Sequence, residues 1–312
     1  MDCSVFKGRS LLTWLDYSGG EIRFLLELAK QVKDEKTRGE IKQRLAGKTV
    51  ALLFEKRSTR TRCAFETAIG EEGGHPVFLS SADIHLGEKE TIEDTARVLG
   101  RMFSAIQFRG FRQSTAETLA KYSGVPVWNG LTDEYHPTQV LADVLTLEEN
   151  FGSSRGKKLC FVGDGRNNVA RSLMVICAKL GIHFTIITPP GLNPDPLLCR
   201  SCETLAAETG SELRVSSDIA EVDGADAIYT DVWASMGEEA KKAERIGLLS
   251  PYQVNRSLMD RTNRRDTIFL HCLPAVRGEE VTSEVLDGPQ SRAWDEAENR
   301  KHTIKAIILA TI

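Results

Sequence analysis

The stretch Thr49-Val-Ala-Leu-Leu-Phe-Glu-Lys-Arg-Ser-Thr-Arg-Thr-Arg62 joins an apolar run directly to a run of hydroxyl and basic residues. The apolar part, which ends at Phe54, has the length of a strand and is typical of a strand buried on both faces of a sheet. A helix is expected to follow from Thr61 to Glu72 and to end at the next two residues, Gly73-Gly74. The stretch therefore predicts a strand–turn–helix unit of a parallel α/β sheet.

The same alternation of strand-length runs and helical segments continues along the chain. Further strands are expected at 125–128, 158–162, 183–188, 225–230 and 267–270. Helices are expected after a capping box at Ser18–Glu21, at 168–180 and, as the last element, at 296–312. The most loop-like central stretch is Asn150–Gly156, which is the predicted domain boundary. We therefore expect an α/β protein with two similar domains, each a mostly parallel sheet flanked by helices. Their expected ranges are 1–150 and 151–295, followed by the helix 296–312.

Composition excludes several classes of protein. The chain has 312 residues, 40 Lys and Arg against 44 Asp and Glu, and a formal net charge of −4, which argues against a general nucleic-acid binder. No apolar run approaches the roughly 20 residues that a membrane helix needs, and the amino terminus does not resemble a secretory signal. Seven scattered cysteines, an odd number, are typical of reduced thiols. These features predict a cytoplasmic protein without nucleic-acid or membrane partners.

The segment Ser58–Arg62 is the first candidate site. It follows a buried strand and opens a helix, so free backbone N–H groups and the positive end of the helix dipole lie beside hydroxyl groups. Lys56, Arg57, Arg60 and Arg62 add cations. A solvated basic helix start is the ordinary interpretation of such a run. The position at the carboxyl end of a strand, where open α/β sheets bind ligands, favours a phosphate or carboxylate site instead.

Three further segments place polar residues at helix starts or strand ends. His136-Pro-Thr-Gln139 opens a helix, and its two polar side chains could donate to a carbonyl oxygen, although a capped turn is the commoner role of such a segment. His271-Cys-Leu-Pro274 follows an apolar run, where a cysteine is usually a small buried hydrophobe. Asp231 also ends a predicted strand.

Two segments suggest cofactors and are discounted. Gly163-Asp-Gly165 resembles the start of a dinucleotide fingerprint, but Asn168 stands where its third glycine would be, and no acid follows the next strand. Cys199 and Cys202 have metal-ligand spacing without a second ligand pair. We therefore expect neither a nicotinamide cofactor nor a metal.

Taken together, these segments resemble the carbamoyltransferase family, and the ornithine branch of it in particular. The Ser-Thr-Arg-Thr-Arg run marks the wider family, whereas Ser-Met-Gly and His-Cys-Leu-Pro are similar to the ornithine enzymes and differ from the aspartate enzymes. The matching segments occur in family order over essentially the whole chain: 54–62, 83–87, 94–99, 109–110, 136–139, 163–168, 231–237, 271–274 and 297–300.

The resemblance implies an activity and an assembly. The δ-amine of L-ornithine would attack the carbamoyl carbon of carbamoyl phosphate and yield citrulline and phosphate, a step of arginine biosynthesis. The first domain would bind carbamoyl phosphate, the second ornithine, and the last helix would pack back on the first domain. A homotrimer with active sites at subunit interfaces is implied, without metal or organic cofactor.

The resemblance also implies a role for individual residues. The carbamoyl-phosphate site would comprise Ser58, Thr59, Arg60, Thr61, Arg109, His136, Gln139, Cys272, Leu273 and Arg300. The ornithine site would comprise Asn168, Asp231, Ser235 and Met236. Within these sets the catalytic group would be Arg60, Arg109, His136 and Cys272.

Other functions remain open from sequence alone. A putrescine or other amine carbamoyltransferase would share the phosphate segment but differ at Ser-Met-Gly. A dehydrogenase is disfavoured by Asn168 and Pro189, and a binding protein without activity would be expected to lack Arg60 or Cys272. The sequence does not distinguish synthesis of citrulline in the cell from its breakdown.

Overall fold

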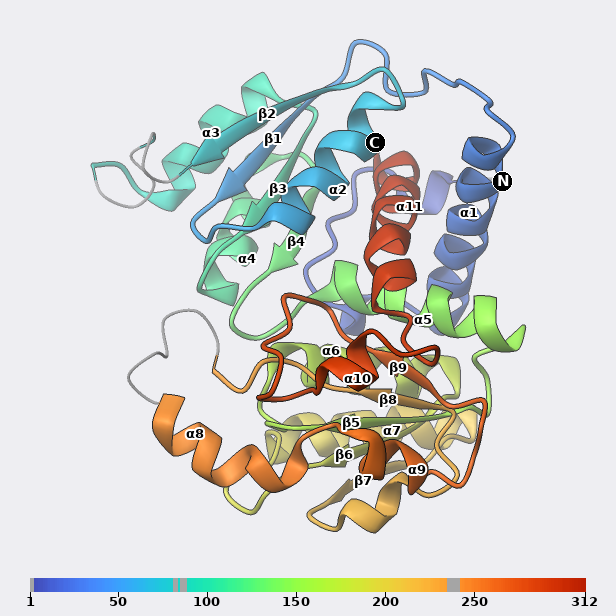
Figure 1. The fold of residues 1–312 in the computed structure, drawn as a ribbon. Coiled ribbons are helices and arrows are strands. Elements are labelled where there is room, and N and C mark those ends of the chain that lie inside the picture. The colour runs from blue at the N-terminus through green and yellow to red at the C-terminus, as the bar shows by residue number, and fades with distance from the viewer. Residues whose placement is uncertain (1–2, 81–83, 85–88, 235–241) are drawn as a thin grey trace. The chain divides into compact units, whose positions relative to one another are not determined.

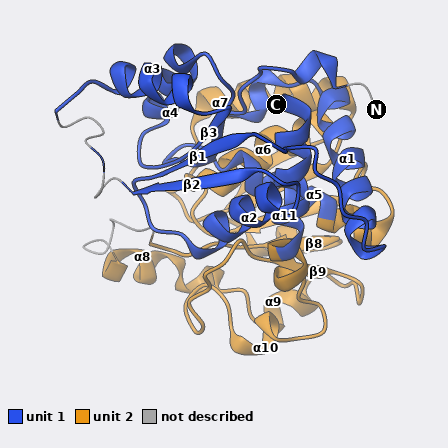
Figure 2. Cartoon of the chain, turned by 90° about the horizontal axis from the view of Figure 1, so that it is seen from above, with its two compact units in different colours: residues 1–145, 298–312 blue, residues 146–297 orange. Residues whose placement is uncertain are grey.

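The structure, a computed structural model, describes residues 3–80, 84, 89–234 and 242–312. The chain forms two compact units, residues 1–145 with 298–312 and residues 146–297 (Figure 2). Each unit contains one parallel sheet with helices packed against it (Figure 1). The predicted α/β class with two parallel sheets is confirmed.

The sheet of the first unit has the strand order β2-β1-β3-β4, and every pair in it is parallel. Its strands are β1 (Thr49–Phe54), β2 (His75–Ser80), β3 (Ala105–Arg109) and β4 (Val127–Leu131). Phe54, the last residue of β1, lies opposite Arg109, the last residue of β3. The carboxyl ends of these two central strands therefore lie side by side at one edge of the sheet.

Helices cover both faces of this sheet. They are α1 (Gly19–Thr37), α2 (Thr59–Gly70), α3 (Ile92–Met102), α4 (Gln113–Ser123), α5 (Pro137–Phe151) and α11 (Ala293–Thr311). One face packs on α3 and α4 through a cluster that includes Leu53, Phe108 and Leu119. On the other face Trp128 of β4 stacks on Phe65 of α2, and its indole N–H donates to Thr311 of α11.

The carboxyl-terminal helix thus packs on the first unit, as predicted. Lys33 of α1 donates to Asn299 at 2.7 Å, and Lys305 of α11 pairs with Glu71 at 2.7 Å. Residues 298–312 accordingly belong to the first unit, although the chain has passed through the second before reaching them.

The sheet of the second unit has the strand order β7-β6-β5-β8-β9, again with parallel pairs throughout. Its strands are β5 (Lys158–Val162), β6 (His183–Ile187), β7 (Leu213–Ser216), β8 (Ala227–Tyr229) and β9 (Ile268–Leu270). Its helices are α6 (Asn168–Leu180), α7 (Pro196–Thr209), α8 (Lys242–Leu249), α9 (Arg256–Asp260) and α10 (Ser283–Leu286). Short 3₁₀ turns cover Ser4–Phe6, Trp14–Asp16, Ile219–Val222 and Ser250–Tyr252.

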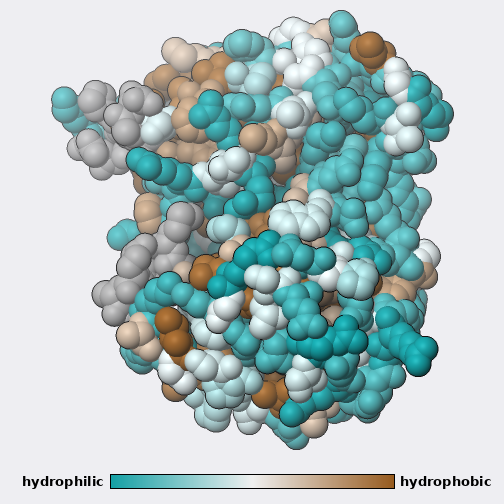
Figure 3. Space-filling model, in the orientation of Figure 1, coloured by the Kyte–Doolittle hydropathy of each residue, from teal (hydrophilic) through white to brown (hydrophobic). Residues whose placement is uncertain are grey.

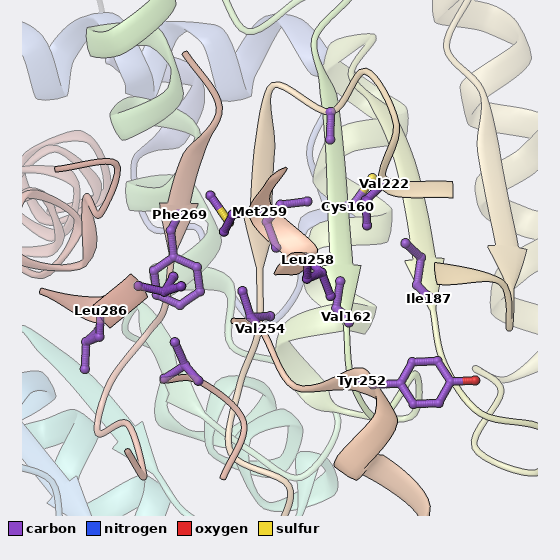
Figure 4. Packing of buried hydrophobic residues seen from close by; sticks show 14 of the residues in the cluster. Cys160, Val162, Ile187, Val222, Tyr252, Val254, Leu258, Met259, Phe269 and Leu286 are labelled. Atoms are coloured by element: carbon purple, nitrogen blue, oxygen red, sulfur yellow. The ribbon is translucent and has the colours of Figure 1, made fainter. Parts of the chain in front are cut away.

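One face of this second sheet is covered by short elements rather than by long helices. Cys160, Val162 and Phe269 of the strands pack against Leu258 and Met259 of α9 (Figure 4). The alternation of side chains along each strand leaves Phe161 and Tyr229 on the opposite face, where their rings stack with centroids 6.0 Å apart. Both faces are therefore buried, which explains the continuous apolar runs in the sequence.

Several element boundaries differ from the prediction. Helix α2 begins at Thr59 rather than Thr61, because Ser58 is its N-cap. Strand β4 covers 127–131 instead of 125–128, since α4 ends at the left-handed Gly124 and Pro126 has no N–H for the sheet. The sequence patterns also did not single out the edge strands β2 and β7, whose residues are largely half-buried or exposed, or the buried central strand β3.

Hydrophilic side chains cover most of the face of the molecule seen in Figure 3. Among the described residues, none of the helices has the length and apolar composition that crossing a membrane requires.

Candidate active site

The candidate anion site lies at the start of α2, directly after β1. Ser58 has an extended backbone, and its hydroxyl accepts a hydrogen bond from the N–H of Thr61 at 3.2 Å. This cap orients the first turn of the helix, whose remaining N–H groups face outward with the positive end of the dipole. Thr59 is exposed there and Arg60 is half-buried. The local geometry expected from the sequence is therefore present.

Thr61 is the point at which two distant arginines meet. Its hydroxyl oxygen accepts from Arg109 at 3.0 Å and from Arg300 at 2.8 Å, and all three residues are buried. Arg109 comes from the end of β3 and Arg300 from α11. Two positive charges are thus held beside the helix start, where guanidinium groups bind phosphate or carboxylate oxygens well.

Close packing of backbone elements supports this arrangement. A Cβ added at Gly130 of β4 would lie 2.5 Å from the Gln107 side-chain nitrogen and 3.1 Å from the Thr61 methyl group. Glycine therefore lets β4 approach the helix start without displacing the side chains of Gln107 and Thr61.

His136 lies buried among the same cations. Burial, followed by the charges of Arg300, Arg109 and Arg60, lowers the pKa of His136 well below its usual value of 6.5. The imidazole is therefore neutral around neutral pH, and a neutral ring can donate a hydrogen bond from only one nitrogen. The structure brings together the predicted residues of the first unit, His136 and the three arginines.

Gln139 has a partner that the sequence reasoning missed. Its side-chain N–H₂ donates to Asp143 at 2.9 Å, one turn further along α5, and both residues are fully buried. Gln139 and Asp143 are four residues apart on a predicted helix, and this spacing could have indicated the contact. The start of this helix is fixed from outside, because the Trp14 indole donates to the Pro137 carbonyl at 2.9 Å.

The second unit has its own group of polar side chains, centred on Asp231. This residue lies just beyond β8, between the ends of β5 and β9 in the sheet order. One carboxylate oxygen accepts from Asn167 at 2.9 Å, and the other accepts from the Cys272 thiol at 3.1 Å. The N–H of Val232 donates to that second oxygen at 2.8 Å. Three strand ends thus contribute to one polar cluster.

The asparagine that donates to Asp231 is Asn167, the neighbour of Asn168, which the sequence predicts as a contact of ornithine. Asn167 is the N-cap of α6, and its side-chain oxygen accepts from the Val169 N–H at 2.7 Å. Asn168 is the first residue of the helix and is half-buried. The capping position before a helix was the sequence feature that could have identified Asn167.

Cys272 and Leu273 form a tight turn after β9. Leu273 has a φ of +56°, and its N–H donates to the His271 ring at 2.8 Å. The other ring nitrogen of His271 lies 3.3 Å from Glu280, and both side chains are fully buried. The turn is therefore held by the histidine beneath it, an element that the motif alone did not reveal.

Asp231, His271 and Cys272 also have the composition of a metal site, with ligand atoms within 4.8 Å of one another. Both ring nitrogens of His271 already have hydrogen-bond partners, however. The donor set that remains, one carboxylate and one thiol, is too small for the four ligands of a typical zinc site. We assign no metal here. The predicted residues Ser235 and Met236 lie outside the described residues.

Comparisons with known proteins match this geometry over both units. Residues 9–149 match the family model of the aspartate/ornithine carbamoyltransferase carbamoyl-P binding domain, and residues 155–311 match that of the Asp/Orn binding domain. A curated ornithine carbamoyltransferase of Caldanaerobacter subterraneus is 66% identical over 307 residues, 98% of each chain. A catabolic ornithine carbamoyltransferase of Streptococcus gordonii is 51% identical, covering 100% of this chain and 98% of the relative.

A solved structure leads to the same family. The ornithine carbamoyltransferase from Pyrococcus furiosus superposes with a TM-score of 0.95 at 47% identity, covering 98% of this chain and 97% of that one. Family models cover nearly the whole chain, and the identities far exceed what a shared fold alone would produce. The chain therefore belongs, with these ornithine carbamoyltransferases, to the aspartate/ornithine carbamoyltransferase family of enzymes.

Proposed function

We propose that the protein transfers the carbamoyl group of carbamoyl phosphate to the δ-amine of L-ornithine, which yields L-citrulline and phosphate. The observation that carries this proposal is the meeting of Arg109 and Arg300 on Thr61 at the start of α2. It offers several donors to a small dianionic ligand in a place where water is largely excluded.

The first unit would hold carbamoyl phosphate. Backbone N–H groups of the α2 start, with Ser58, Thr59, Arg60, Thr61 and Arg109, would bind the phosphate. The carbamoyl group would be bound by Arg300, by the neutral imidazole of His136 and by Gln139. Donors aimed at its oxygen stabilise the negative charge that develops as the tetrahedral intermediate forms. The arginines then also stabilise the departing phosphate.

The second unit would hold ornithine. Asp231 presents a carboxylate for the α-ammonium group, and Asn168, Ser235 and Met236 are the further proposed contacts. Cys272 and Leu273 would lie beside the reacting δ-amine and carbamoyl nitrogen. The Cys272 thiol donates to Asp231, so the residue is already connected to a proton acceptor.

Attack requires the amine to be neutral. The reference pKa of such an amine is about 10.4, so a small fraction is nucleophilic at physiological pH. Holding it against the carbamoyl carbon raises its effective concentration by orders of magnitude. The neutral amine attacks and forms the C–N bond, the C–O bond breaks with its electron pair on the departing phosphate, and the phosphate accepts the proton that the nitrogen loses.

The decisive experiment offers carbamoyl phosphate with ornithine, putrescine or N-acetylornithine and measures the ureido product, which is citrulline in the case of ornithine, by a colorimetric assay. Citrulline formation that is selective for ornithine supports the proposal. Equal efficiency with putrescine would replace ornithine by a simple amine as the acceptor, and absence of any product would exclude the activity.

We further propose a cellular setting. Carbamoyl phosphate is a reactive anhydride and citrulline a stable urea, so the chemistry favours citrulline synthesis and hence arginine biosynthesis. All seven cysteines are free thiols, in keeping with a reducing cytoplasm. The proposed assembly is a homotrimer, and no metal or organic cofactor is required by the steps above. Light scattering tests the assembly, and activity after exhaustive chelation tests metal independence.

A further inference from the structure

We propose that Asp143 is a positioning residue that orients the amide of Gln139 and thereby makes the site select a carbamoyl group over other acyl groups. This inference rests on the proposed function and goes beyond it. It starts from one buried hydrogen bond, in which Gln139 Nε2 donates to Asp143 Oδ1 at 2.9 Å.

The two ends of the Gln139 amide are chemically different, although they have nearly the same shape. The nitrogen donates and the oxygen accepts, whereas a carboxylate can only accept. Asp143 therefore holds the nitrogen end toward itself, and the oxygen of Gln139 points the other way. Both residues are 0% exposed, so water cannot compensate if the amide turns over. Two acceptors would then face each other in a dry interior, which disfavours the flipped state by at least about tenfold.

The positive charges near Gln139 explain why a hydrogen-bond acceptor at this place is important for binding a carbamoyl group. The charges of Arg300, Arg109 and Arg60 act on His136, which directly precedes α5, the helix that carries Gln139. Guanidinium groups can only donate, and they suit the oxygens of an acyl phosphate. A carbamoyl group differs from an acetyl group of similar size by an N–H₂ group, which needs an acceptor. The Gln139 oxygen, fixed by Asp143, supplies that acceptor.

A Gln139 oxygen held in this orientation is expected to give a strong preference for a carbamoyl group over an acetyl group. A site built to pair a substrate N–H rejects an analogue that lacks it, because its buried polar atom would then have no partner. If the Gln139 amide were free to turn, its N–H₂ would meet the substrate N–H₂, and the preference would fall. Asp143 thus acts on selectivity without contacting the substrate.

The test compares the single variant Asp143→Asn with a double variant in which Gln139 becomes glutamate and Asp143 becomes asparagine. Asp143→Asn provides an N–H₂ that can bond the Gln139 oxygen, so the Gln139 amide is no longer held in one orientation. The ratio of the KM for carbamoyl phosphate to the inhibition constant of acetyl phosphate measures the preference. We expect the KM to rise at least about tenfold in this variant while the acetyl phosphate constant changes little. The kcat at saturating substrate should change less than the KM.

The double variant Gln139→Glu with Asp143→Asn restores the polarity of the hydrogen bond. The introduced asparagine would donate to one oxygen of the introduced glutamate, and the other carboxylate oxygen would again face the substrate, with the net charge of the pair unchanged. We expect recovery of most of the lost preference. Asp226→Asn is the matched control for stability, because Asp226 is a buried carboxylate of the second unit that bonds to the Lys158 N–H.

An unchanged preference in Asp143→Asn, or a swapped pair that folds and shows no recovery, overturns the inference. If Asp143→Asn does not fold, the swapped pair alone decides, since its hydrogen bond is intact. These outcomes differ from failure of the proposed function, in which the parent protein itself forms no citrulline.

Discussion

Arg300 donates a hydrogen bond to the hydroxyl oxygen of Thr61 at 2.8 Å, which links the last helix of the chain to the start of α2. Arg109 donates to the same oxygen at 3.0 Å. A hydroxyl oxygen that accepts twice still has its own hydrogen to donate. Thr61 therefore orders both guanidinium groups before any substrate binds, and such preorganisation is a major source of transition-state stabilisation.

Replacing Thr61 by valine should expose this role. Valine keeps the shape but removes the acceptor, so Arg109 and Arg300 lose their common partner in a buried place. We expect kcat/KM for carbamoyl phosphate to fall roughly 10- to 100-fold and the melting temperature to decrease. Thr61→Ser keeps the hydroxyl and should retain most of the activity. Equal losses in both variants would mean that packing, and not the hydroxyl, is required.

Arg60→Ala should reduce activity through phosphate binding and leaving-group stabilisation. Loss of one charge-assisted contact in a desolvated site should lower kcat/KM roughly 10²- to 10³-fold. Arg60→Lys should recover little, because an ammonium cannot replace a bidentate guanidinium. Arg38→Ala, which removes an exposed arginine paired with Glu40, is the control. Parental kinetics in either Arg60 variant would remove this residue from the phosphate site.

The pH profile should be set by the amine and not by His136. Because burial and the three arginines hold the pKa of His136 well below its usual value of 6.5, its ring is neutral at and above neutral pH. The kcat/KM for ornithine should then rise with pH as the amine, with a reference pKa near 10.4, loses its proton. His136→Asn should lower the rate without changing the shape of the curve. A step near neutral pH that disappears in this variant would contradict the assignment.

Asp231→Asn should narrow the preference for ornithine over putrescine. The carboxylate that accepts from Asn167 and Cys272 also provides the negative charge for an α-ammonium group, which putrescine lacks. We expect kcat/KM for ornithine to fall by roughly tenfold or more, and that for putrescine to fall less. Asp260→Asn, at an exposed pair with Arg256, should change neither value. Equal losses for both amines would show that Asp231 does not recognise the head group.

Acid should destabilise the protein through Glu71, which joins α2 to the last helix. Burial acts to raise the pKa of Glu71, but hydrogen bonds from Lys305 and Lys36 outweigh it and lower the pKa to about 2. The unfolded value is 4.5, so this stabilisation is present above about pH 4.5 and is lost as the pH falls toward 2. Its upper bound is about 3.5 kcal/mol, because one pKa unit corresponds to about 1.4 kcal/mol, and screening by solvent makes the actual contribution smaller.

Thermal unfolding at several pH values measures this contribution. Glu71→Gln should lower the melting temperature around neutral pH and make it less sensitive to acid. Glu66→Gln, on the same helix, removes a half-exposed pair with Arg62 and should have a small effect. The expectation is wrong if the two variants lose stability equally at all pH values.

Local sequence patterns accounted for most of the secondary structure. The run Thr49–Phe54 is a strand and Ser18 opens α1 with a capping box, because apolar continuity and side-chain caps act within a few residues. The limits of α6, Asn168–Leu180, agree with the prediction for the same reason. Edge strand β2 was not singled out, since its half-buried side chains produce no continuous apolar run.

The sequence by itself determined the fold class, the helix start that carries Ser58 and Thr61, and the position of Asp231 and Cys272 at strand ends. Only the tertiary structure decided which of these groups meet. Arg300 reaches Thr61 because α11 returns to the first unit, and Asn167 reaches Asp231 because β8 lies beside β5. Such contacts depend on strand order and helix packing between distant parts of the chain, which no local periodicity encodes. Capping, strand length and patterning act locally and can be read from the sequence, whereas the direction of a buried side chain follows from the partners that the completed fold places around it.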